Sequence, residues 1–178
     1  MADAPRFERE ELDDVAHQIK EVYAQYGLTN YFAQVVEKGT VNALTLKQTA
    51  TSRQPTTETW DRFFAKNARL TLGQLLRRFE TTFPEEPAVT AALKVALPRR
   101  NHVAHTFFWD RAAHFDSFAG REAMLADLEA DRVMFQETNA LVSDLVQRTF
   151  ARGGMTQERF DVLVSEEVAA LRADVPKD

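Results

Sequence analysis

Hydrophobic residues recur every three to four positions along most of the chain, and no stretch alternates between apolar and polar residues for the length of a strand. This spacing predicts a first helix over about residues 7–27, ending or kinking near Gly27, and a second helix over about 31–44. The segment 50–59 is rich in Ser and Thr and contains a proline, so we expect a loop there.

Helix boundaries are best marked in the middle of the chain. Aromatic side chains begin a short predicted helix over residues 60–69. Thr71 and Gln74 then have the spacing of a capping box, in which each side chain bonds a backbone N–H near the other, and this predicts a helix through Phe79. The Pro-Glu-Glu-Pro string at 84–87 ends that helix and starts the next one.

The last third of the chain predicts longer helices. Because the residue before a proline disfavours helical backbone, we expect a kink or a fresh helix start at Pro98 and a helix over about 98–112. A turn is expected over 117–120, followed by one long helix over 121–150 with a buried apolar stripe. After two glycines, 153–178 predicts an amphipathic helix and a tail.

These patterns predict an all-α protein, an up-and-down helical bundle formed by residues 1–152, with 153–178 as a C-terminal appendage. The absence of cysteine excludes disulfides, thiolate metal sites and cysteine nucleophiles. No apolar run is long enough to span a membrane, and the first residues do not resemble a secretory signal. We therefore expect a cytoplasmic protein that does not engage membranes.

Charge is unevenly distributed along the chain. The net charge is −5, which argues against broad binding to a nucleic acid backbone. Residues 1–59 have a net charge of −3 and residues 114–178 of −6, whereas residues 60–113 carry nine basic and five acidic side chains, a net charge of +4. The middle segment therefore predicts a local anion site, or else an ordinary fluctuation of charge along the sequence.

The four histidines are the main candidates for chemistry. We expect His17 to lie in solvent or at the edge of the first helix, and His114 to complement the dipole at a helix end. His102 and His105 lie one helical turn apart, but no other ligands have zinc-site spacing, so we expect no metal. No organic cofactor is implied either, because the sequence has no glycine-rich phosphate loop.

Arg100, Asn101 and His105 combine groups suited to metal-free phosphodiester cleavage. An arginine stabilises charge on phosphoryl oxygens, and a histidine moves protons near neutral pH. Asn101 and His105 are four residues apart, so the amide is placed to orient the imidazole. Arg100 lies about 140° around an ideal helix from His105, a gap that its long side chain or a second subunit must close.

The string Arg-Asn-x-x-x-His from Arg100 to His105 resembles the signature of the HEPN superfamily of helical-bundle proteins. The surrounding residues 97–108 are similar to those of uncharacterised bacterial HEPN-like proteins, as are 34–37 and 71–76. The resemblance covers about residues 20–150. It implies a HEPN-like bundle, to which this chain adds helical segments at both ends.

The resemblance also implies a function. HEPN members include metal-independent endoribonucleases, among them toxins and phage-defence effectors, and they act as homodimers whose motif residues meet in one RNA-cleaving cleft. Carried over to this chain, Arg100 binds the phosphate, His105 acts as acid or base and Asn101 orients it, with Arg99 and His102 as auxiliary residues. The implied partners are RNA at a local basic cleft, a second copy of the chain, and an antitoxin or regulatory protein.

Two other functions use the same residues. Arg100, Asn101 and His105 could form a polar network in a non-catalytic helical dimerisation module, or an anion or nucleotide site in a regulator. The run Phe107-Phe108-Trp109 could stack RNA bases, although consecutive aromatic residues on a helix more often face a core or an interface. The acidic residues Asp127, Glu129 and Asp131 are expected on a solvated helix face.

Overall fold

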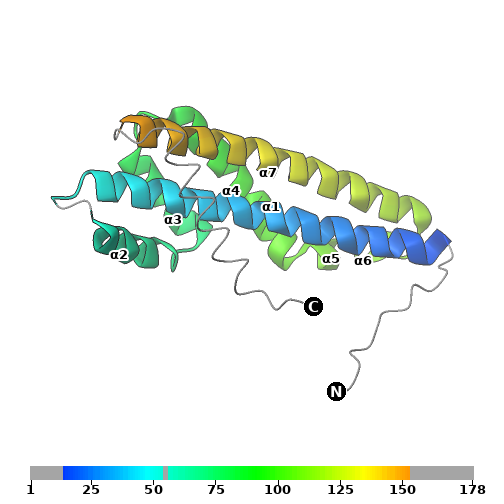
Figure 1. The fold of residues 1–178 in the computed structure, drawn as a ribbon. Helices are drawn as coiled ribbons and strands as arrows, with labels where there is room; N and C mark the ends of the chain where they lie inside the picture. Colours follow the sequence, from blue (N-terminus) through cyan, green and yellow to red (C-terminus); the bar gives the residue numbers. More distant parts are fainter. Residues whose placement is uncertain (1–13, 54–55, 153–178) are drawn as a thin grey trace, which may run out of the picture.

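The computed structural model describes residues 14–53 and 56–152, and within these ranges it contains helices and no strand (Figure 1). The helices are α1 (Asp14–Ala50), α2 (Thr57–Asn67), α3 (Leu72–Thr82), α4 (Pro87–His105), α5 (Phe107–Asp110), α6 (Ala112–Phe115) and α7 (Phe118–Arg152). The all-α prediction is confirmed. The predicted C-terminal helix and the start of the first predicted helix lie outside the described residues.

The three long helices are α1, α4 and α7, and α4 runs in the opposite direction to the other two. Gln18 of α1 bonds Glu122 near the start of α7, and Gly39 lies against Val142 near its end, so α1 and α7 run parallel. Helix α4 runs antiparallel to α7, because Arg99 pairs with Asp131 whereas Glu86, at the start of α4, pairs with Arg148. Figure 1 shows α1 and α7 side by side along their whole lengths, with α4 behind them.

Two apolar clusters form the core. The larger one joins the C-terminal half of α1, α3, most of α4 and the C-terminal half of α7, and includes Phe79, Phe83, Leu93 and Phe135. The smaller one lies at the opposite end of the bundle, where Phe107 of α5 meets Val22, Met124 and Leu128 of α1 and α7. Helix α4 ends where the second cluster begins.

Helix α1 does not end near Gly27, one of the two predicted alternatives, but continues to Ala50. The residues on either side of the glycine, Val22 and Ala33, are buried, and the buried Thr29 hydroxyl donates to the backbone oxygens of Gln25 and Leu128. A glycine inside a helix costs about 1 kcal/mol relative to alanine, less than burying these side chains gains. The predicted helix end near Gly27 was wrong because packing on α7 outweighs local propensity.

Several boundaries are where the sequence placed them. Thr71 and Gln74 form the predicted capping box, with both reciprocal bonds present, at the start of α3. Pro87 occupies the first turn of α4, where its missing N–H has no helical partner to lose. The long helix predicted over 121–150 is α7, with Leu128 and Phe135 buried as expected.

Helix α4 continues through Pro98, where a kink or a fresh start was expected, and ends earlier than predicted. It passes through Pro98 without a fresh start, because Leu93, Ala96 and Val103 on either side of the proline are all buried against the bundle. It then ends at His105 rather than near residue 112, and two short helical turns follow. The chain must turn here to bury Phe107 in the smaller cluster.

Helix α7 begins at Phe118, inside the expected turn. The Ser117 hydroxyl accepts a hydrogen bond from the backbone N–H of Gly120 at 3.1 Å, which caps the first helical turn. Among the described residues, none of the helices has an apolar stretch that would reach across a bilayer.

Candidate functional site

The arginine–histidine motif occupies the last two turns of α4, between the two core clusters. Arg100 points toward α1, where its Nη2 donates to Glu37 Oε2 at 3.1 Å. Its Nη1 donates to Asn101 Oδ1 at 3.2 Å. The guanidinium is thus held on the flank of α4 by one carboxylate and one amide, and its side chain retains 27% exposure.

Arg99, in contrast, holds two helices together. Its Nε and Nη2 donate to the two carboxylate oxygens of Asp131 at 2.6 and 2.8 Å, a bidentate pair that joins α4 to α7. The Asp131 side chain is only 5% exposed, and these bonds raise the pKa of Arg99 further above its ordinary range. A side chain committed to a buried carboxylate is poorly placed to bind substrate as well.

His105 is the exposed member of the motif. It lies at the C-terminal end of α4, and within the described ranges its side chain has no hydrogen bond or ion pair. Asn101 is exposed too, but its amide oxygen accepts from Arg100, and the described residues provide no bond between Asn101 and His105. The structure therefore couples Asn101 to Arg100 and leaves the imidazole of His105 open to solvent.

His102 faces the corner between α4 and α5. Its Nδ1 lies 3.0 Å from the Thr106 hydroxyl and 3.3 Å from Asp110 Oδ2. The imidazole stands edge-on to Phe107, with ring centroids 5.8 Å apart. His102 and His105 thus point to different surroundings although they are only one turn apart.

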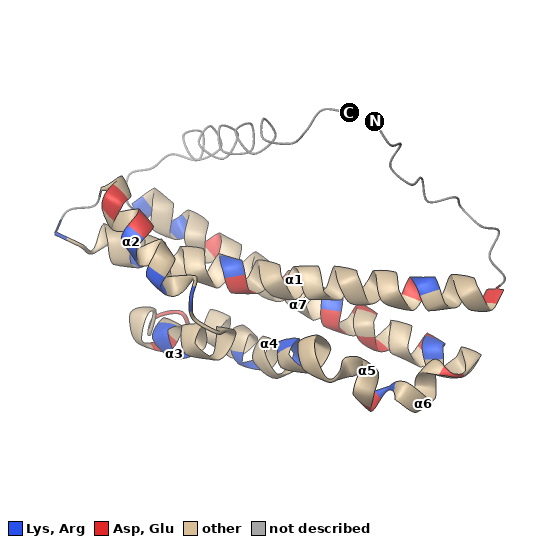
Figure 2. Cartoon of the chain, turned by 90° about the horizontal axis from the view of Figure 1, so that it is seen from below, with Lys and Arg blue, Asp and Glu red and all other residues tan. Residues whose placement is uncertain are grey.

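Four of the nine basic side chains in the middle segment form ion pairs in the described structure. Arg99 and Arg100 pair with carboxylates of α7 and α1, Arg111 pairs with Asp127 of α7, and Lys94 pairs with Glu80. Figure 2 shows acidic and basic positions side by side on α1 and α7. The acidic ends of the chain therefore supply counter-charges to three arginines of the +4 segment, at and just after the motif.

The aromatic run after the motif divides between core and surface. Phe107 is buried, and Phe108 packs partly buried against Tyr23, Tyr26 and Phe115. Trp109, in contrast, is 85% exposed on α5. The expectation that these aromatic residues face a core or an interface is thus confirmed for Phe107 and Phe108, which pack in the core of this chain, whereas Trp109 faces solvent.

Three carboxylates around the motif were missed as functional neighbours: Glu37, Asp110 and Asp131. A signal existed for Asp131, which lies three residues after Leu128 and four before Phe135 on the predicted buried stripe. A charged residue at a position of the buried stripe predicts a buried ion pair. The expectation that Asp131 lies on a solvated helix face was therefore wrong. Glu37 has no comparable local signal, since its partner is 63 residues away.

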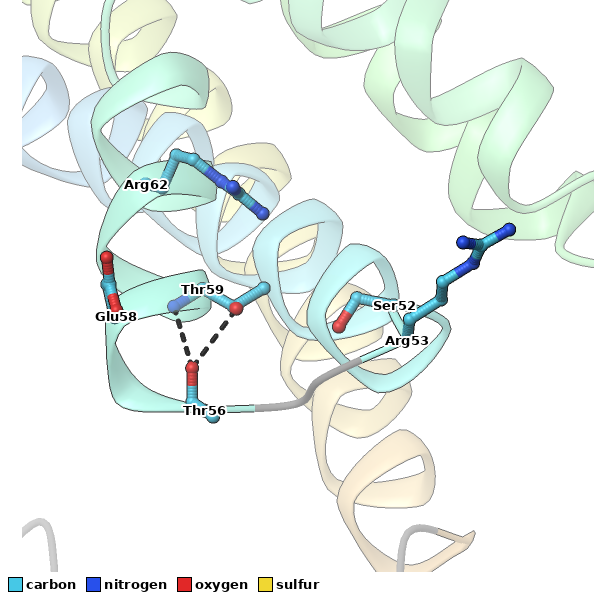
Figure 3. A pocket seen from close by; sticks show the side chains of 6 residues that line it. All are labelled: Ser52, Arg53, Thr56, Glu58, Thr59 and Arg62. Atoms are coloured by element: carbon cyan, nitrogen blue, oxygen red, sulfur yellow. Dashed lines mark hydrogen bonds between the residues drawn. The ribbon is translucent and has the colours of Figure 1, made fainter.

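A separate polar hollow lies at the start of α2, at the far end of α1 from α5 and α6 (Figure 3). Six residues line it: Ser52, Arg53, Thr56, Glu58, Thr59 and Arg62. The Thr56 hydroxyl already accepts the backbone N–H of Thr59 as a helix cap, and the Arg62 guanidinium lies 5.3 Å from the Phe63 ring. This hollow contains none of the predicted site residues.

Within the described ranges, no group of three or more His, Cys, Asp or Glu side chains is arranged to hold a metal ion. Comparisons of the chain with models of protein families, with curated proteins and with solved structures give no match.

Proposed function

We propose that this chain is a metal-independent RNA endonuclease of HEPN type. The observation that carries the proposal is the contrast between two groups on α4. His105 is exposed and has no described partner, whereas Arg100 lies on the flank of the same helix with its side chain 27% exposed. An accessible imidazole and a guanidinium on one helix can supply proton transfer and phosphate stabilisation, the two needs of this reaction.

In this proposal Arg100 binds the scissile phosphate. Its bond to Glu37 is a partly exposed ion pair, which contributes only about 0–1 kcal/mol and can therefore yield to a phosphate. Asn101 accepts from the same guanidinium, so its role here is to orient Arg100. The exposed indole of Trp109 offers a face on which an RNA base can stack.

The proposal includes a homodimer. Arg100 turns toward α1 while His105 faces solvent, so a cleft that uses both on one phosphate is more readily completed by a second copy of the chain. Mixing two inactive variants, Arg100→Ala and His105→Ala, tests this idea. If the site is composite, mixed dimers regain about a quarter of wild-type activity, because half of the dimers are mixed and each has one intact site.

The primary test is RNA cleavage by the purified full-length chain in the presence of EDTA. We expect His105→Ala to lower the cleavage rate about 100-fold or more, the usual contribution of a general acid or base. His17→Ala is the matched control, since His17 is also exposed on a helix but lies far along α1 from the motif. Equal rates for the wild type and His105→Ala would eliminate this mechanism.

A second function is favoured by one specific observation. Arg99 and Arg100 tie α4 to α7 and α1, as expected of a non-catalytic helical module whose polar residues maintain its packing. In that case Arg100→Ala lowers the melting temperature, and neither the wild type nor any variant cleaves RNA. His105→Ala leaves stability unchanged under both functions, because the side chain is exposed.

A further inference from the structure

The corner between α4 and α5 holds a histidine–carboxylate pair that the motif does not include. His102 Nδ1 lies 3.3 Å from Asp110 Oδ2, and its ring is set edge-on against Phe107. Phe107 is 1% exposed and anchored in the smaller core cluster. The imidazole therefore lies between a carboxylate and a buried aromatic ring, which together orient it.

The contact with Asp110 favours one ring nitrogen of His102 as the site of the proton. A carboxylate has only acceptor atoms, so a favourable contact with Asp110 requires that Nδ1 of His102 bear the hydrogen. The hydrogen-bond partner of the same nitrogen is the Thr106 hydroxyl, 3.0 Å away, which accepts the hydrogen in this tautomer. In the neutral ring Nε2 is left with a free lone pair, the arrangement by which a carboxylate prepares a histidine to act as a base.

We propose that His102, positioned by Asp110, is the general base of the reaction and His105 is the general acid. This inference rests on the proposed RNA cleavage. His102 Nε2 removes the proton of a ribose 2′-hydroxyl, whose oxygen bonds to phosphorus as the bond from phosphorus to the 5′-oxygen breaks. Protonated His105 gives its proton to that 5′-oxygen. The products are a 2′,3′-cyclic phosphate and a 5′-hydroxyl.

The positions of the two histidines suit these different roles. They are three residues apart, and side chains at this spacing are neighbours on one side of a helix. The proton that His102 takes up at Nε2 leaves Nδ1 on its contact with Asp110 Oδ2, 3.3 Å away. His105 has no described carboxylate partner and is open to solvent, where it can be reprotonated between turnovers.

The first experiment examines the pair without using activity. Nitrogen-15 NMR of the histidine-labelled full chain at mildly alkaline pH reports which ring nitrogen of each neutral imidazole bears hydrogen, and the spectrum of His102→Gln assigns the signal. We expect hydrogen on Nδ1 of His102 in the wild type, and a shift of population toward Nε2 in Asp110→Ala. Asp116→Ala, an exposed aspartate at the end of α6, should leave the signal unchanged.

The second experiment separates the acid from the base. RNA with sulfur in place of the bridging 5′-oxygen has a thiolate leaving group, which departs without a proton. On this substrate His105→Ala should recover most of its activity, whereas His102→Ala should stay about 100-fold below the wild type. Asp110→Ala should lower the rate about tenfold on both substrates, since it affects only the base.

The outcomes distinguish this inference from the proposed function. If His105→Ala is inactive on ordinary RNA but His102→Ala and Asp110→Ala cleave like the wild type, His102 is not the base and the proposed function stands. Recovery of His102→Ala rather than His105→Ala on the sulfur substrate would reverse the two roles and overturn the inference. If the wild type does not cleave RNA, both proposals fail, and the NMR result reports only a structural pair.

Discussion

Arg99 and Asp131 form a bidentate ion pair between α4 and α7, with the Asp131 side chain almost completely buried and the Arg99 side chain 43% exposed. We expect Arg99→Ala to lower the free energy of unfolding by about 3 kcal/mol, because it leaves a buried carboxylate without a counter-charge. Chemical denaturation of the purified variant measures this loss.

Arg132→Ala is the control for that experiment. Arg132 pairs with Glu129 within α7 at the surface, and an exposed pair of this kind contributes little to stability because solvent screens it. If both variants lost the same small amount, Asp131 would not depend on Arg99 for its burial.

Two glycines should respond in opposite directions to alanine. Gly27 is exposed in the middle of α1, and a Cβ added there meets no atom within 4 Å, so Gly27→Ala should stabilise the protein by about 0.5–1 kcal/mol. Gly120 is buried in the first turn of α7, where a Cβ would overlap the backbone carbonyl oxygen of His114. Gly120→Ala should therefore be strongly destabilising, and thermal unfolding of both variants checks the pair.

Acid should weaken the junction between α3 and α4. A hydrogen bond from its own backbone N–H and the bond from Lys47 hold the pKa of Glu85 below its ordinary value. A carboxylate with a lowered folded-state pKa stabilises the protein above the ordinary glutamate pKa, and the contribution disappears as the pH falls through the lowered value.

Glu85→Gln should therefore be less stable than the wild type near neutral pH, and the two should converge as the pH falls below the ordinary range for glutamate. Denaturation across this pH range measures the difference. Glu137→Gln is the control, because Glu137 is exposed on α7 and has no ion pair within the described residues. A difference that persisted at low pH would show that Glu85 acts by packing rather than by charge.

Trp109 gives a direct measure of RNA binding. The chain has two tryptophans, so Trp60→Phe leaves Trp109 as the only indole, and His105→Ala in the same chain prevents cleavage under the proposed mechanism. We expect single-stranded RNA to quench the fluorescence of Trp109, and Trp109→Ala to weaken binding about tenfold, as for one stacked base. Phe118→Ala, which removes another exposed aromatic side chain, should leave binding unchanged.

Local patterns predicted the helical elements well where the deciding interaction is near in sequence. The capping box of Thr71 and Gln74 joins residues three apart, so the sequence contains both partners within one turn. The buried stripe of α7 follows from the helical period of its apolar residues, and Leu128 and Phe135 are buried as that period predicted. The all-α class follows from such local regularities.

The continuity of α1 and α4 was not predictable in the same way. Gly27 and Pro98 are ordinary signals for a helix end, yet both lie inside helices. The contacts that outweigh them come from other helices, as in the hydrogen bond from Thr29 to Leu128, 99 residues away. Local propensities of about 1–3 kcal/mol are overcome when both flanks of the residue are buried in a core.

The same distinction between local and long-range interactions applies to the candidate site. By itself, the sequence determined a helical protein and the spacing that places Arg100, Asn101 and His105 on the last turns of one helix. Only the tertiary structure decided that Arg99 is committed to Asp131, that Arg100 pairs with Glu37, and that His105 is left open. The reason is that a helix fixes the neighbours of a residue within four positions, whereas the counter-charges are 32 and 63 residues away and meet the arginines only when the helices pack.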